Sequence, residues 1–94
     1  MSQFQSGMLA YLEEKEDSGE RMTVHEKKML RVLRLPKNNR LRNRELARLE
    51  KVATDKLRDD GHVGAIDWGS INWEKLFAQL LAFIKAILAL FAVV

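Results

Sequence analysis

The chain has 94 residues, a net charge of +3 and a hydrophobic content of 47%. This length allows one small domain, whose core is only marginally self-sufficient. The absence of cysteine excludes disulfide bonds, thiolate metal sites and cysteine nucleophiles. No secretion signal is expected, because polar residues directly follow Met1 where a basic and then apolar leader would begin.

Positive charge is concentrated in the middle of the chain. Residues 1–22 carry a net charge of −3, residues 27–58 carry +9 and residues 59–94 carry −2. Such a block usually contacts phosphate, either of nucleic acid or of an anionic lipid surface. The alternative is a charged face that is merely solvated. The predicted phosphate contacts are Lys27, Lys28, Arg31, Arg34, Lys37, Arg40, Arg42, Arg44 and Arg48.

Residues 1–20 predict a short N-terminal helix followed by an acidic linker. Phe4, Met8 and Leu12 recur at helical spacing within residues 3–15. The acidic stretch that follows contains Gly19 and is expected to end the helix and to lie in solvent.

Residues 21–61 predict a basic helical hairpin. Its first helix begins at Thr23, which forms a capping box with Glu26: each side chain can bond the backbone of the other residue. Pro36 ends this helix, because proline cannot continue the backbone hydrogen bonding. A short loop then leads to the second helix.

The second helix of the hairpin is expected over residues 40–59. Apolar residues at spacings of three and four form a stripe along it, made of Leu46, Leu49, Val52, Ala53 and Leu57. Gly61 is the predicted C-cap. The two helices are expected to pack together in an antiparallel arrangement.

Residues 62–72 predict a glycine-containing linker that leads into the last helix. Asp67 is expected to order this loop. Either Ser70 or Asn72 can cap the helix that follows, because both side chains can accept a hydrogen bond from a free backbone NH.

Residues 73–94 predict one hydrophobic helix, which would be about 33 Å long and would match a bilayer core of about 30 Å. Trp68 and Trp73 precede the apolar run, where a belt at the membrane boundary would place them. Lys85 lies near the middle of the run, where a charge is costly in lipid. A lone spanning helix is therefore marginal.

A stripe of small and polar side chains on this helix predicts self-association, with the large residues facing lipid. Two alternatives remain: an oligomer in water with the large residues inward and Lys85 outward, and the core helix of an ordinary monomer. The predicted membrane or oligomer interface is Trp68, Trp73, Gln79, Ala82, Lys85, Ala86 and Ala89.

No catalytic, cofactor-binding or metal-binding residue is predicted. His25 and His62 are far apart and lack the spacing of metal ligands, and Asp59 and Asp60 beside His62 give too few further ligands. The sequence contains no nucleophile with a partnered base and no glycine-rich phosphate loop. We therefore expect a protein that is not an enzyme.

The predicted fold is all-α: a short N-terminal helix, a basic helical hairpin and a C-terminal hydrophobic helix, either membrane-associated or in an oligomeric bundle. This basic head and apolar tail resembles the layout of small membrane or virion accessory proteins of bacteriophages. The predicted function is that of a membrane-associated structural protein, a candidate virion component, that binds copies of itself through residues 73–94 and contacts phosphate through its basic hairpin. Its N-terminal part is expected on the cytoplasmic or virion-interior side. The alternatives are a soluble adaptor whose tail helix docks into other subunits of a larger particle, and a pore-forming or lysis protein.

Overall fold

The computed structural model describes residues 2–91, which form five α-helices. They are α1 (Gln3–Asp17), α2 (Val24–Leu33), α3 (Arg40–Asp59), α4 (Trp73–Gln79) and α5 (Leu81–Phe91). No β-strand occurs within this part of the chain, and the predicted all-α class is confirmed.

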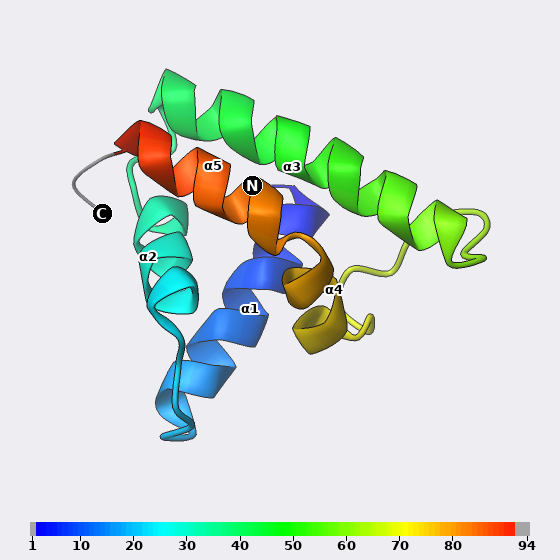
Figure 1. The fold of residues 1–94 in the computed structure, drawn as a ribbon, viewed down its shortest axis with the longest axis horizontal. Coiled ribbons are helices and arrows are strands. Elements are labelled where there is room, and N and C mark those ends of the chain that lie inside the picture. Colours follow the sequence, from blue (N-terminus) through cyan, green and yellow to red (C-terminus); the bar gives the residue numbers. More distant parts are fainter. Residues whose placement is uncertain (1, 92–94) are drawn as a thin grey trace.

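Helix α5 lies against the more N-terminal helices. α1 packs on α2, α2 packs on α5, and α3 packs on both α4 and α5. In Figure 1, α3 and α5 run side by side along the upper part of the molecule, with α1 and α2 below them. Helix α2 thus packs mainly on α1 and α5, and α3 packs mainly on α4 and α5. The two helices do not form the closely packed hairpin that the sequence predicts.

The ends of the charged helices follow the sequence closely. Thr23 Oγ1 accepts from the NH of Glu26 at 3.1 Å, and Glu26 Oε1 accepts from the NH of Thr23 at 2.8 Å. The predicted capping box is therefore confirmed. Gly61, with a φ of 96°, follows α3 in the left-handed region that glycine favours. The NH groups of Gly61 and His62 donate to carbonyls of the last turn. The C-cap residue itself is Asp60, one position before the predicted Gly61.

The linker before the C-terminal helices is also ordered as expected. Asp67 accepts hydrogen bonds from the NH of Gly69 at 3.1 Å and from the hydroxyl of Ser70 at 2.7 Å. Asn72, rather than Ser70, caps α4 by accepting from the NH of Lys75 at 3.1 Å. The loop therefore fixes the point at which the hydrophobic segment begins.

The prediction of one continuous hydrophobic helix is wrong, because the helix breaks at Leu80. The break turns the chain so that α4 buries Leu76 while α5 buries Ile84 and Leu88. Residues 92–94, the predicted end of the helix, lie outside the described residues.

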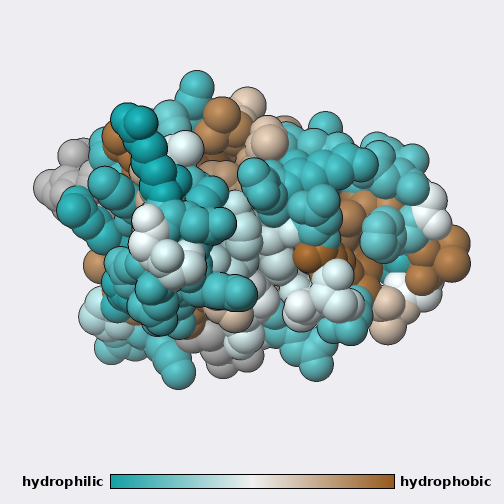
Figure 2. Space-filling model, turned by 90° about the horizontal axis from the view of Figure 1, so that it is seen from below, coloured by the Kyte–Doolittle hydropathy of each residue, from teal (hydrophilic) through white to brown (hydrophobic). Residues whose placement is uncertain are grey.

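Among residues 2–91, the structure contains no helix whose length and apolar character would allow it to cross a membrane. The spanning helix expected from the sequence is therefore not found. Most large apolar residues of α4 and α5 are buried in the chain's own core instead, namely Trp73, Leu76, Phe77, Ile84, Ile87 and Leu88. The face of the molecule in Figure 2 is mostly hydrophilic, with apolar side chains in separate patches.

Helix α1 touches the linker at a point where only glycine fits. A Cβ atom at Gly7 would stand 2.5 Å from the carbonyl oxygen of Trp68, closer than non-bonded atoms approach. The same helix buries Phe4, Met8 and Leu12, as their spacing predicts. This contact ties the start of the chain to the segment that leads into α4.

Candidate functional site

The predicted interface tryptophans lie inside the protein. Trp68 is 7% exposed and Trp73 is 5% exposed. The indole NH of Trp73 donates to the carbonyl oxygen of Trp68 at 2.7 Å, and the ring of Phe4 lies 4.9 Å from that of Trp68 and 5.6 Å from that of Trp73. These rings build an aromatic core, so neither offers the accessible surface that a membrane or oligomer contact requires.

The other predicted interface residues lie on the outer surface. Those exposed are Gln79, Ala82, Lys85, Ala86 and Ala89. The large residues Ile84, Ile87 and Leu88 of α5 are buried. This is the reverse of the favoured arrangement, in which the large residues would face lipid and the small stripe would be covered. The observed arrangement has the large residues inward and Lys85 outward, as in the alternative of an oligomer in water. Here, however, the large residues are buried within a single chain.

Two large apolar side chains of α5 remain only partly covered. Phe83 is 46% exposed and Leu90 is 53% exposed. They are seven residues apart, two helical turns, and therefore lie on the same side of the helix. Ala86 lies between them and is also exposed. Helix α5 thus has an apolar face that the other described residues do not cover.

That face forms one wall of a groove between α3 and α5. The groove has a volume of about 490 Å³. Its apolar lining comes from both helices and consists of Leu49, Val52, Phe83, Ala86, Ile87 and Leu90. Charged side chains of α3 form the rest of the lining, namely Glu45, Arg48 and Lys51. An apolar floor with a charged edge is typical of protein-binding surfaces.

The carboxylate in this groove is neutralised by its neighbours. Glu45 has a side-chain exposure of only 5%, and its Oε2 lies 2.9 Å from Nε of Arg44 and 3.8 Å from Nη1 of Arg48. A buried carboxylate without such partners would be costly. Together with Lys51, these residues leave the α3 edge of the groove with an excess of positive charge.

One of the nine predicted phosphate contacts is buried and cannot reach a phosphate surface. Arg42 is 2% exposed and donates to the carbonyl oxygen of Leu33 at 3.0 Å, to Asn43 Oδ1 at 2.7 Å and to Gln5 Oε1 at 3.2 Å. Its Nε has no partner within the described residues, and burial lowers the pKa of the guanidinium. Arg42 ties α3 to the end of α2 and to α1, a role that a charge count cannot predict.

Three more of the predicted phosphate-contacting residues form ion pairs with acidic residues of the chain itself. Arg34 lies 3.0 Å from Glu16 and 3.4 Å from Glu13, while Arg44 and Arg48 bind Glu45. Within residues 2–91 the remaining side chains have no ion pair; Lys28 is half-buried and the others are exposed. These remaining residues are Lys27, Lys28, Arg31, Lys37 and Arg40.

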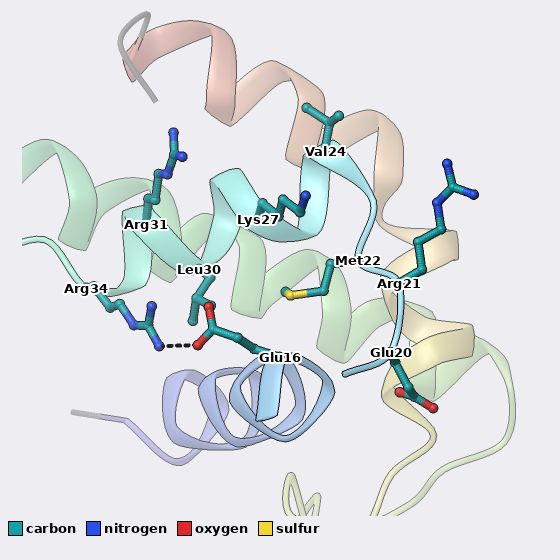
Figure 3. A pocket seen from close by; sticks show the side chains of 9 residues that line it. All are labelled: Glu16, Glu20, Arg21, Met22, Val24, Lys27, Leu30, Arg31 and Arg34. Atoms are coloured by element: carbon teal, nitrogen blue, oxygen red, sulfur yellow. Dashed lines mark hydrogen bonds and ion pairs between the residues drawn. The ribbon is translucent and has the colours of Figure 1, made fainter. Parts of the chain in front are cut away.

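A second hollow, of about 540 Å³, lies between the end of α1 and α2. Its lining mixes apolar, acidic and basic side chains: Glu16, Glu20, Arg21, Met22, Val24, Lys27, Leu30, Arg31 and Arg34. Figure 3 shows Arg34 turned towards Glu16. Because the acidic residues compensate part of the basic charge, the hollow does not form a uniform anion site.

Glu26 combines its capping role with a second function that the sequence does not reveal. Its Oε2 accepts from the hydroxyl of Tyr11 at 3.0 Å and from Nζ of Lys15 at 2.9 Å. Burial alone would raise the pKa of this carboxyl, but the hydrogen bonds from Thr23, Lys15 and Tyr11 outweigh it and hold the pKa below its usual range. Glu26 therefore fastens α2 to α1.

The candidate site of this protein is the apolar groove between α3 and α5. Among residues 2–91, no three His, Asp or Glu side chains come together as metal ligands would. No family model matches the chain, and no curated protein or solved structure is significantly similar to it. The comparisons thus lend no support to the resemblance to bacteriophage proteins, and the function has to be argued from the groove itself.

Proposed function

We propose that this chain is a non-enzymatic assembly or adaptor protein that binds a helix of another protein in the groove between α3 and α5. The observation that carries the proposal is the uncovered apolar face of α5. Phe83 and Leu90 are about half exposed in a helix that buries Ile84, Ile87 and Leu88. Apolar surface left open above a groove is a common feature of docking sites.

The shape of the groove favours a helix as the occupant. Its walls are two neighbouring helices that contribute residues at helical spacing, Leu49 and Val52 from α3 and Phe83, Ile87 and Leu90 from α5. A third helix can place an apolar stripe into such a groove, as amphipathic helices do in many complexes. This differs from the adaptor expected from the sequence, because α5 here receives a helix and stays in its own core.

The test is binding of a synthetic amphipathic helix with neutral flanks. The peptide has about 18 residues, or about five turns, with leucine along one face and glutamine along the other. We expect it to bind the full chain, measured by fluorescence anisotropy, and expect Phe83→Asp to weaken binding about tenfold or more because the charge would enter the apolar floor.

Val63→Asp is the matched control, since Val63 is 88% exposed and lies outside the groove. Circular dichroism checks that both variants remain folded. The proposal is wrong if the peptide does not bind, or if both substitutions weaken binding equally.

A second candidate function is contact with phosphate through α2 and the loop that follows it. The observation in its favour is that Lys27, Arg31, Lys37 and Arg40 are exposed and have no ion pair within the described residues. Binding of this kind draws affinity from the release of counterions and weakens steeply with salt.

The test uses double-stranded DNA in one arm and vesicles with anionic lipid in the other. Lys27→Glu with Arg31→Glu is expected to weaken binding and to reduce its salt dependence. Phe83→Asp is the control, because it lies on α5 and leaves the basic residues unchanged. Equal binding by the double variant and the native chain would show that these side chains are merely solvated.

A further inference from the structure

We infer that the helix held by the α3/α5 groove belongs to a different protein and carries acidic residues on the flank of its apolar stripe that faces α3. This inference rests on the proposed function and specifies its partner. The charges around the groove carry it.

The edge of the groove on α3 is positive. Arg48 and Lys51 line it, Arg44 lies one turn before Arg48, and Glu45 is already paired with both arginines. A helix lying in the groove would therefore pass a row of basic side chains along one flank. Acidic side chains on that flank would gain attraction, and basic ones would be repelled.

The wall of the groove on α5 is apolar. α5 carries one charged side chain, Lys85, which is exposed. The small residues Ala82 and Ala89 lie beside it on the outer surface. Lys85 does not line the groove, because about 200° of helical rotation separates it from Phe83. The charge that can select a partner therefore lies on the α3 edge.

The same charges argue against a second copy of the chain as occupant. In a two-fold dimer, α5 of the partner would enter the groove and each interface would be repeated by symmetry. The only charged residue of that helix is Lys85, so α5 of a second copy would offer no acidic side chain to Arg48 and Lys51. A partner that lacks complementary charge is disfavoured relative to one that has it.

The experiment compares two synthetic helices that share the leucine stripe of the neutral peptide. One has glutamate on both flanks and the other has lysine. We expect the glutamate peptide to bind the full chain about tenfold more tightly, the size expected from about three surface ion pairs. The difference should shrink at high salt, because salt screens exposed charges.

The charge-reversed variant Arg48→Glu with Lys51→Glu should lose or invert this preference while still binding the neutral peptide. Lys27→Glu with Arg31→Glu is the matched control: it changes the net charge equally but acts on α2, away from the groove. Equal preference in both double variants would mean that overall charge, and not the groove edge, selects the peptide, and the inference would be overturned.

The failure of this inference can be distinguished from the failure of the proposed function. If all three peptides bind equally and Phe83→Asp weakens each of them, the groove holds a helix but does not select acid. If none binds, the proposed function fails first. If sedimentation shows a dimer that Phe83→Asp converts to a monomer, a second copy occupies the groove and the choice of a different partner is wrong.

Discussion

Helices α3 and α5 lie side by side over the same core, yet their outer faces differ. α3 buries one apolar stripe and covers its other side with charged residues, such as Arg48 and Lys51. α5 buries Ile84 and Ile87 but exposes Phe83, Leu90 and a row of alanines. A charged outer face is satisfied by water, whereas an apolar one gains free energy when it is covered. The outer face of α3 is therefore stable in water without a partner, whereas the outer face of α5 would gain free energy by binding one.

The largest loss of stability is expected from substitutions on the inner faces of α3 and α5, where both helices are buried. Ile84→Ala on α5 and Leu49→Ala on α3 should each lower the free energy of unfolding by about 2–5 kcal/mol, because both side chains are buried and would leave cavities. Urea denaturation measures this. A loss below about 1 kcal/mol for Ile84→Ala alone would show that α5 is not part of the common core.

A smaller loss is expected at the contact that holds α4 in position below α5. Gly7→Ala adds a Cβ that would clash with the carbonyl oxygen of Trp68, and the strain should cost about 1–3 kcal/mol. Thermal unfolding followed by circular dichroism measures the change. Gly69→Ala is the control, since its Cβ would meet only the Asp67 side chain at 3.4 Å, an ordinary contact distance.

Helix α5 packs on α2, and Glu26 links α2 to α1. Glu26→Gln removes the charge from its bonds to Lys15 and Tyr11 and should cost about 1–3 kcal/mol at neutral pH. Urea denaturation at pH 7 measures this loss. A change within about 0.5 kcal/mol would show that the charge of Glu26 does not hold the two helices together.

The same substitution has a defined pH dependence. The pKa of Glu26 is lower in the folded chain, so its contribution is complete above the unfolded pKa of about 4.3 and is lost as the pH falls through the folded value. The stability difference between the native chain and Glu26→Gln should therefore narrow in acid. A difference that stays constant from pH 7 to pH 3 would contradict this assignment.

The smallest effect on stability is expected on the outer faces, where the comparison is most specific. Leu90→Gln on α5 and Arg48→Gln on α3 should each change the free energy of unfolding by about 0.5 kcal/mol or less. Of these two variants, only Leu90→Gln should reduce the binding of a hydrophobic dye, because Leu90 is an exposed apolar side chain and Arg48 is charged. Equal dye binding by both variants would remove the distinction between the two helices.

Features that depend on neighbours in sequence could be predicted. The capping box at Thr23, the glycine after α3 and the ordering of the linker by Asp67 all follow from residues within a few positions of one another. The apolar stripe of α3 is likewise fixed by local periodicity: Leu46, Leu49, Ala53 and Leu57 are buried and Val52 lines the groove. The sequence identified these elements because their causes are local.

Features that depend on distant contacts could not be predicted. A run of apolar residues reads the same whether lipid or the protein itself will surround it, so the sequence did not show that α5 packs on α2. Arg42 looks like its exposed neighbours until Leu33 and Gln5 are seen to surround it. The groove was missed for the same reason, since its two walls are more than 30 residues apart in sequence.

The way in which α5 completes the core has a consequence for synthesis on the ribosome. Helices α1 and α2 leave the ribosome well before α5, yet α5 packs on α2 and is the last described helix of the chain. Domains in which late segments close the core fold only after nearly the whole chain has emerged. Nascent chains of this protein therefore pass through a period in which Met29, Leu33 and their neighbours are open to chaperones and to aggregation, and that period ends when α5 arrives.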